Sequence, residues 1–516
     1  MRLLRFSLLA ALPLSLFACE GNTVTPPTGT GGSTTTNTGG TGASAGEGGA
    51  GAQGGAGAQG GSGGAGAQGG SGGAGAQGGT GGTGAQGGTG GGVGGSPSDS
   101  LFDLTAGSAA DDPARGVAVD SAGDAIIAGA FTGDIDLGGE VFTSEMTDIF
   151  LAKVDTTGTF VWKKKFGTAM NDRPVAVSVT PQGQILVAGS FAAVGGNWGG
   201  DPYNGTGPLF AKLAPDGTNL WTKPWGLNGM GSWGTLTADT DGTAWVTGSF
   251  NGTLDFGGGD VSSTGTLDVF IAHLDTNGGL LDLDVKAGDV TVRGQAPDGQ
   301  GGLFLAGTFK GTLDLGAGPI TTADPMVAES FLCRLAPGGA AAWSKKLPGI
   351  IQRVAADSNG DVAVTGYFNG TADFGTGMLV STGADDIYVL KIALDGTPMW
   401  AKKLGSTSND AGRAIATDAS GNIYVTGFFS GAPDFGMGPV VVGMGRNVLV
   451  AKLGPDGTVL GAKGFGGDGN EEGLHIAVDS LGSAFAYGEF DMPADFGSGL
   501  KMSVGMKDVF LLKTAF

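Results

Sequence analysis

One short motif, a glycine and a phenylalanine separated by a single residue, recurs along most of the chain at a nearly constant interval. Successive copies are 59 to 61 residues apart, and the seven copies begin at Gly129, Gly189, Gly248, Gly307, Gly366, Gly427 and Gly488. Self-similarity at one period is typical of repeat architectures, in which each unit buries its apolar face against its neighbours. The chain therefore encodes seven copies of one structural unit rather than several unrelated domains.

Each period contains four short segments with the composition of β-strands. In the first period these are 117–120, 125–131, 149–154 and 160–166, and a short glycine-containing turn separates the members of each pair. Four such segments predict one four-stranded antiparallel sheet, whose strands we call A to D in chain order. A period of about 60 residues with four strands is typical of a β-propeller blade.

The two ends of the repeat region complement each other. The seventh unit ends at Phe516 after its C strand, whereas 101–112 precedes the first A strand and matches 161–172, which contains the D strand of the first unit. An N-terminal strand that completes the last blade would close the ring and remove both open sheet edges. We therefore predict an all-β fold, a seven-bladed β-propeller of four-stranded antiparallel blades over residues 101–516.

Several segments of the repeat resemble a known family. Val117-Ala-Val-Asp120, Gly129-Ala-Phe131, Phe150-Leu-Ala-Lys153 and Trp162-Lys-Lys164 look like the SBBP-type bacterial β-propeller repeat. The resemblance extends over residues 101–516 and implies a propeller of the kind found mainly in secreted and surface proteins. It implies no catalytic residues, because the family has no catalytic motif to transfer.

The N-terminus has the pattern of a secretory signal. Arg2 and Arg5 precede a short apolar stretch, and Leu16-Phe-Ala-Cys19 resembles the lipobox of bacterial lipoproteins, in which the cysteine is diacylated and becomes the first mature residue. We predict a lipoprotein signal peptide over residues 1–18 and lipidation at Cys19. The alternative is ordinary signal cleavage near Ala18, which would leave a free thiol.

A low-complexity segment separates Cys19 from the repeats. Residues 21–95 contain 36 of the 108 glycines of the chain, in short units built from Gly, Ala, Gln, Ser and Thr. Such a segment has almost no apolar surface to bury and cannot compensate for the entropy of ordering. We predict a disordered linker over residues 19–100, with a root-mean-square span of about 45 to 50 Å for a Gly-rich coil.

Charge and rare residues exclude several classes of function. The formal net charge is -21, and it resides on the globular part because the four charged residues among 1–97 sum to zero. This balance excludes nucleic acid as an expected partner, because such a partner needs a basic surface. Two Cys and two His exclude a disulfide scaffold and a zinc cluster and leave little basis for His-dependent catalysis.

Residue types that occur in every unit are expected to be structural. Each C strand carries one cation, at Lys153, Lys212, His273, Arg334, Lys391, Lys452 and Lys513. These cations would form either a functional basic ring or structural pairs with acids at the ends of A strands, such as Asp120, Asp239, Asp357, Asp418 and Asp479; we favour the pairs, because buried charges persist when paired. The D-strand tryptophans are expected to pack on the outer blades, at Trp162, Trp221, Trp343 and Trp400. Cys333 is expected to be a small buried apolar residue.

Aromatic residues outside the repeat pattern gather in the second unit and are the candidate ligand-binding residues. They are Trp198, Tyr203, Trp225 and Trp233, accompanied by Asp201. The loop between strands B and C and the connection from strand D to the next blade emerge on one face of a propeller, so these residues are placed on the same side. Exposed aromatic rings beside polar groups would stack on sugars or hold a peptide. The alternative is that the tryptophans fill gaps in a glycine-rich loop.

Acidic residues recur at the blade junctions and are candidate calcium ligands. Asp111-Asp112, Asn171-Asp172, Asn409-Asp410 and Asn470-Glu471-Glu472 offer oxygen ligands, although none matches a calcium-loop pattern. We expect no cofactor and no metal, with calcium as the alternative.

No catalytic residues are predicted, since residues 101–516 contain no Gly-x-Ser-x-Gly elbow and no His-Glu-x-x-His motif.

These observations lead to one expected function and two alternatives. We expect a monomeric lipoprotein of the cell envelope, held on the outer membrane or the cell surface by its acyl chains. Its propeller would be a non-catalytic binding or scaffolding module for an unknown protein or polysaccharide ligand. The alternatives are a periplasmic assembly platform for other proteins and a polysaccharide-active hydrolase or lyase, whose paired carboxylates one sequence cannot locate.

Overall fold

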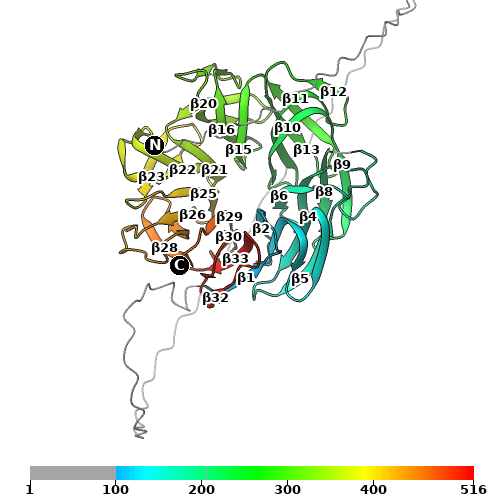
Figure 1. Cartoon of the computed structure of the whole chain (residues 1–516). Coiled ribbons are helices and arrows are strands. Elements are labelled where there is room, and N and C mark those ends of the chain that lie inside the picture. The colour runs from blue at the N-terminus through cyan, green and yellow to red at the C-terminus, as the bar shows by residue number, and fades with distance from the viewer. Residues whose placement is uncertain (1–99, 206) are drawn as a thin grey trace, which may run out of the picture. The chain divides into compact units, whose positions relative to one another are not determined.

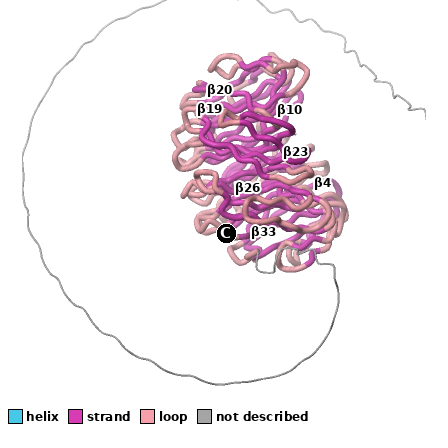
Figure 2. The backbone as a smooth tube through the Cα atoms, turned by 90° about the vertical axis from the view of Figure 1, so that its left-hand side faces the viewer, coloured by secondary structure: helices cyan, strands magenta, loops and turns pink. Residues whose placement is uncertain are grey.

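A computed structural model describes residues 100–205 and 207–516, with the side chains of 227–233 left out. The predicted signal peptide, Cys19 and the linker up to residue 99 lie outside the described residues. Figure 2 shows strands and loops and no helix in the described part. Within that part there is accordingly no helix long and apolar enough to cross a membrane.

Seven blades, each a sheet with four main strands, stand around a common axis, and one strand of each blade is innermost (Figure 1). These A strands are β2 (Ala114–Val119), β6 (Arg173–Val179), β10 (Gly226–Ala238), β15 (Asp289–Pro297), β21 (Ile350–Ala356), β25 (Ala411–Thr417) and β29 (Glu472–Val478). Each A strand contacts the next around the ring, and β29 contacts β2, so the ring is closed.

The other strands follow outward in chain order in six blades, and in the last blade the outermost strand is the N-terminal one. The B strands are β3 (Ala125–Asp136), β7 (Ile185–Phe191), β11 (Ala244–Asp255), β16 (Leu303–Lys310), β22 (Val362–Asp373), β26 (Ile423–Ser430) and β30 (Ala484–Phe490). The C strands are β4 (Val141–Val154), β8 (Gly207–Leu213), β13 (Asp268–Leu274), β19 (Glu329–Leu335), β23 (Met378–Ile392), β27 (Arg446–Leu453) and β33 (Asp508–Thr514).

The outermost D strands are β5 (Phe160–Phe166), β9 (Asn219–Pro224), β14 (Leu280–Lys286), β20 (Ala341–Leu347), β24 (Pro398–Leu404), β28 (Val459–Gly467) and β1 (Phe102–Ala106). Short extra strands lie in connections between B and C strands, at β12 (Asp260–Ser262), β17 (Thr312–Leu313), β18 (Ile320–Thr321), β31 (Ala494–Asp495) and β32 (Leu500–Lys501). The predicted seven-bladed, all-β propeller is confirmed.

The N-terminal strand closes the ring as predicted. β1 pairs antiparallel with β33, in a register that places Phe102 opposite Lys513 and Ala106 opposite Val509. Lys501 adds an ion pair to Asp103 at 3.0 Å. The last blade therefore takes three strands from the C-terminal end of the chain and one from the other end of the propeller region.

The recurring glycine is required by a β-bulge in each A strand. In every blade it pairs with an A-strand residue beside a register shift, for example Gly366 with Ile351 and Gly427 with Gly412. A Cβ on Gly366 would lie 1.9 Å from the carbonyl oxygen of Ile350. No other residue fits so close to a neighbouring backbone. The motif thus marks the place where the inner strand bends.

The D-strand tryptophans connect neighbouring blades. Trp162 donates its indole N–H to the carbonyl oxygen of Pro215 in the next blade at 3.0 Å, and Trp400 does the same to Pro455 at 2.9 Å. Each ring lies over a turn glycine that has no room for a side chain; a Cβ on Gly457 would come within 2.8 Å of Trp400. The predicted outer-blade packing is therefore packing between blades.

Candidate functional site

Two of the candidate aromatic residues are buried in blade cores. The ring of Trp198 is 0% exposed and makes edge contacts with Phe166 and Phe191, at centroid distances of 4.9 and 5.4 Å. Its indole N–H donates to the carbonyl oxygen of Leu209 at 3.2 Å. Trp225 is 2% exposed, and the centroid of its ring lies 4.3 Å from that of Phe210. Both rings belong to the core cluster between the second and third blades.

The expectation that these two tryptophans present exposed rings is therefore wrong. Their indoles fill space that small glycine-rich loops leave open in the core, which is the packing alternative. Tyr203 is half-buried and packs against the cluster that contains Trp198, while Asp201 is exposed. The side chain of Trp233 lies outside the described residues. Trp198 and Trp225 belong to separate core clusters, so the described candidates do not form one aromatic surface.

The acids at the blade junctions bond to their own loops. Asp112 accepts hydrogen bonds from the backbone N–H and the hydroxyl of Ser108, and Asp172 accepts from the same two groups of Thr168. Burial raises the pKa of Asp112 to about 6 and that of Glu471 to about 7. Among the described residues no group of three or more His, Cys, Asp or Glu side chains could hold a metal ion.

The C-strand cations pair with acids in four blades, as predicted. Lys153 contacts Asp120 at 2.7 Å, Lys391 contacts Asp357 at 2.6 Å, and the remaining two pairs are Arg334 with Asp298 and Lys513 with Asp479. In the second blade Thr180 stands where the acid would be, and Lys212 donates to the carbonyl oxygen of Thr276 instead. In the third, His273 stacks on Trp245, and in the sixth Lys452 lies over the ring of Tyr424. These side chains are structural contacts rather than a free basic ring.

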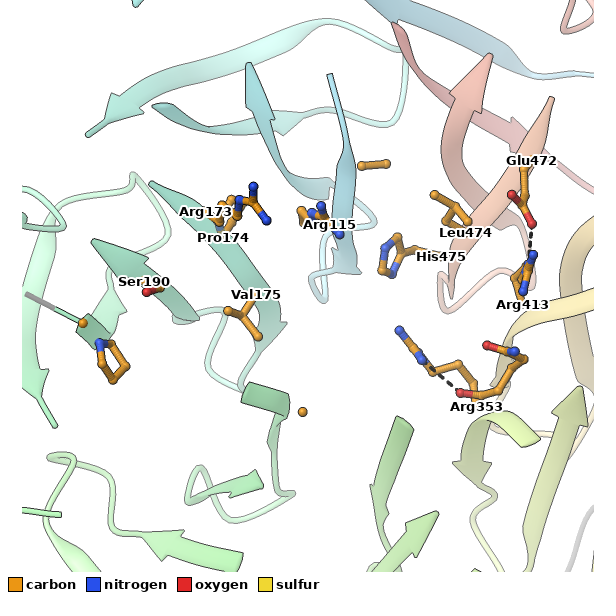
Figure 3. A pocket seen from close by; sticks show the side chains of 15 residues that line it. Arg115, Arg173, Pro174, Val175, Ser190, Arg353, Arg413, Glu472, Leu474 and His475 are labelled. Atoms are coloured by element: carbon orange, nitrogen blue, oxygen red, sulfur yellow. Dashed lines mark hydrogen bonds and ion pairs between the residues drawn. The ribbon is translucent and has the colours of Figure 1, made fainter. Parts of the chain in front are cut away.

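A different set of basic residues surrounds the axis. On the face that carries the B-to-C loops and the D-to-A connections, a cavity of about 640 Å³ opens between the N-terminal ends of the A strands. Its polar lining includes Arg115, Arg173, Arg353, Arg413, Glu472 and His475, which Figure 3 shows around one opening. We call this cavity the channel mouth.

The bulges place these side chains at the mouth. Arg115 and Arg413 are the extra residues of the bulges in β2 and β25, and Arg353 and His475 come directly after the bulges in β21 and β29. A bulge interrupts the alternation of side chains along a strand and turns one residue out of register. The bulge that the repeated glycine accommodates therefore also aims a side chain at the axis.

The channel mouth is electropositive despite the acidity of the chain. Arg413 forms an ion pair with Glu472. No described carboxylate lies within ion-pair distance of Arg115, Arg173 or Arg353. Burial, together with repulsion from Arg293 and Arg413, lowers the pKa of Arg353 to about 10. Burial, reinforced by Arg353 and Arg115, also lowers the pKa of His475 to about 3, so this imidazole is neutral near pH 7.

The opposite end of the channel is acidic. A second opening of about 360 Å³ lies at the ends of the A strands and is lined by Asp120, Asp239 and Asp479. Two of these carboxylates are held by the C-strand lysines described above. The channel therefore has one positive end and one end where carboxylates predominate.

The half-buried His475 of the channel mouth predicts a specific dependence of stability on pH. The unfolded chain takes up a proton at this residue below its ordinary pKa of 6.5, but the folded protein does so only near pH 3. The stability that His475 contributes is therefore complete above pH 6.5 and is lost as the pH falls toward 3, at about 1.4 kcal/mol per pH unit. Asp112 and Glu471, whose pKa values are raised, act with the opposite sign.

Comparison with a His475→Gln variant isolates this group, because the acids are common to both proteins. Between about pH 7.5 and pH 4.5, the free energy of unfolding of the unsubstituted protein should fall by about 2 to 3 kcal/mol relative to the variant. Chemical denaturation at the two pH values measures the difference. Parallel pH profiles would contradict a buried neutral imidazole.

Sequence reasoning missed the arginines of the channel mouth, although a signal was present. Arg293, Arg353 and Arg413 recur at intervals of 60 residues, which is the period of the repeat. The A strands contain no lysine, whereas five of the seven arginines in 100–516 lie in them. This segregation of two chemically similar residues was the available clue.

Comparison with known proteins gives a family match over a short segment. Residues 400–427, from β24 to β26, match the family model SBBP, a beta-propeller repeat. An uncharacterized WD repeat-containing protein of Acanthamoeba polyphaga mimivirus is 24% identical in an alignment of length 452 that covers 69% of this chain. The chain spans 32% of the length of that relative.

Two solved structures are similar in backbone. The β-propeller domain of the Trilobed protease from Pyrococcus furiosus has a TM-score of 0.40 and 8% identity, and the match covers 79% of this chain and 96% of that one. YCF48 bound to the D1 peptide has a TM-score of 0.37 and 10% identity, and the match covers 80% of this chain and 94% of the other.

Proposed function

We propose that residues 101–516 form a non-catalytic binding module of a membrane-anchored lipoprotein displayed at the cell surface. The observation that carries the binding role is the channel mouth, a cavity of about 640 Å³ in which several arginine side chains converge. Concave sites with a few converging polar groups are the usual places where ligands bind. The ligand is a protein or a glycan.

The polar groups of the mouth support binding rather than turnover. General acid–base catalysis near neutral pH needs a group that can exchange a proton there. His475 is neutral down to about pH 3. Among the described residues, Glu472 is the one carboxylate that lines the cavity, and it is paired with Arg413. Glycoside hydrolysis generally needs two carboxyl groups facing each other across the bond to be cleaved.

Protease treatment of intact cells tests the display of the module. A protease that cleaves after alanine should release the propeller, because alanines are frequent in the linker over 19–100. Trypsin is the matched control, since the chain has no lysine or arginine between Arg5 and Arg115, which lies in a folded strand. Release by the first protease and not by trypsin is expected. Full protection of the protein in intact cells would contradict surface display.

Turnover assays test the non-catalytic role. We expect no release of reducing ends and no unsaturated products from a panel of neutral and acidic polysaccharides. Product formation that survives repeated purification and is lost on Glu472→Gln would overturn the proposal.

A further inference from the structure

The arginines of the inner strands are segregated from the other basic residues. Arg115, Arg173, Arg293, Arg353 and Arg413 lie in A strands, at or next to the channel mouth, and the lysines of 100–516 lie elsewhere. A guanidinium presents planar donors that bind carboxylate or phosphate in pairs, and a lysine does not. The choice of arginine over lysine points to recognition of an oxyanion.

Four of these five arginines have no acidic partner among the described residues; Arg413, which pairs with Glu472, is the exception. Acids are not scarce, since the chain has 48 Asp and Glu against 27 Lys and Arg. The buried C-strand cations Lys391 and Arg334 do find carboxylates, at 2.6 and 2.7 Å. The lack of partners at the mouth is therefore a local property of this site.

The arrangement is unfavourable for a protein that binds nothing there. Arg353 donates hydrogen bonds to the carbonyl oxygens of Arg293 and Gln352, at 2.6 and 2.9 Å, which holds its charge close to that of Arg293. The Nε atoms of Arg115 and Arg293 are buried without a hydrogen-bond partner in the described part of the chain. Like charges in proximity and unsatisfied buried donors both destabilise a folded state. An anion bound in the mouth would reduce the repulsion and give Arg115 a partner.

We propose that the channel mouth binds a short anionic part of its ligand, carrying two or more oxyanion groups, carboxylate or phosphate, through Arg115, Arg173 and Arg353. This proposal rests on the binding role proposed above and names the chemistry of the ligand. Pro174, Val175 and Leu474 line the same cavity and would contact the uncharged part of the ligand. The net charge of -21 disfavours long polyanions at longer range, so a short acidic segment such as an acidic oligosaccharide is favoured.

A second cavity adjoins the channel mouth. This opening of about 540 Å³ between the first and last blades shares Arg115 and Arg173 with the mouth, but its lining also includes Lys507 and the carboxylates of Asp111, Asp112 and Glu489. Lys507 is held by Glu489 at 3.2 Å. The oxyanion groups of the ligand are therefore expected in the channel mouth and not in this second cavity.

Isothermal titration calorimetry on the full chain tests the proposal with three probes and a neutral control. The probes are citrate, inorganic phosphate and trigalacturonate, and the control is maltotriose. We expect saturable binding of at least one anionic probe and none of maltotriose. Binding of citrate or trigalacturonate without phosphate would identify a carboxylate ligand, and the reverse result would identify a phosphate ligand; either supports the proposal.

Three substitutions locate the binding. Arg115→Gln and Arg353→Gln should each weaken the binding of the anionic probe about 10- to 100-fold, the range for removing one charge-assisted contact. Lys310→Gln is the matched control, because Lys310 is exposed at the end of β16 on the same face, outside both cavities. It removes the same charge and should leave affinity unchanged.

Thermal unfolding without ligand shows whether each variant is still folded, so that a loss of binding can be assigned to the missing arginine. Arg115 makes no hydrogen bond or ion pair among the described residues, so Arg115→Gln should leave the midpoint unchanged or raise it. Arg353→Gln also removes two hydrogen bonds to carbonyl oxygens, so if this variant fails to fold, Arg115→Gln alone decides. Unchanged affinity in Arg115→Gln, or no binding of any of the three anions at millimolar concentration, would overturn the proposal. Neither result would contradict surface display or the lack of turnover, which the protease and turnover assays test. The anion-binding proposal can therefore fail while the proposed function stands.

Discussion

Deletion of Phe102–Ala106 is expected to reduce the free energy of unfolding of the propeller by about 5 kcal/mol or more, because it removes the strand that closes the ring. β1 forms a five-residue ladder with β33, and Phe102 and Leu104 pack against the core cluster shared by the first and last blades. Without β1 that cluster is opened on one side. β33 also becomes an exposed edge strand, which promotes pairing between molecules.

Thermal unfolding followed by circular dichroism, together with light scattering, measures both effects. The matched control deletes five residues of the linker, 84–88, which shortens the chain by the same amount and leaves the closing strand in place. We expect a lower unfolding midpoint and aggregation only when β1 is removed. Equal stability of the two deletion variants would show that ring closure by β1 contributes little.

Replacement of Cys19 by alanine is expected to move nearly all of the protein from the membrane to the soluble fraction. The lipid anchor is a sequence-based prediction, because Cys19 lies outside the described residues. Each CH₂ of an acyl chain buried in a bilayer contributes about 0.8 kcal/mol, so two or three chains hold a protein firmly. Incorporation of a labelled fatty acid and partitioning into detergent measure the change.

The other cysteine supplies the control for this experiment. Cys333 is fully buried in β19, and burial raises the pKa of its thiol to about 12, so it is not available for acylation. Cys333→Ala should retain both the label and the membrane association. A Cys19→Ala protein that keeps its fatty acid or stays on the membrane would contradict lipidation at this position.

Features of the repeat unit were predictable because they recur. Seven copies of Gly-x-Phe indicated seven blades, and the unmatched segments at the two ends indicated closure by β1. The ion pairs between C strands and A-strand ends followed from the cost of burying a lone charge. The sequence also shows that the second blade lacks an acid at the end of its A strand. It does not show that Lys212 donates a hydrogen bond to the carbonyl oxygen of Thr276 instead.

The candidate binding residues were predicted on the loop-bearing face of the second unit, and the structure buries two of them. The loop-bearing face does carry a cavity, but Trp198 and Trp225 point into blade cores instead. A glycine-rich loop can expose or bury a tryptophan, and the choice depends on the gap beneath it. That gap is formed by residues such as Phe166 in β5 and Phe256 just after β11, which lie outside the loop itself.

By itself the sequence determined the architecture: the number of blades, the strand order within each and the closing strand, because each repeats or completes a pattern along the chain. The convergence of Arg115, Arg173 and Arg353 was decided only by the tertiary structure. These residues are up to 238 positions apart, and they meet because bulged inner strands from different blades surround one axis. Convergence across the axis depends on closing the ring, which no single repeat contains.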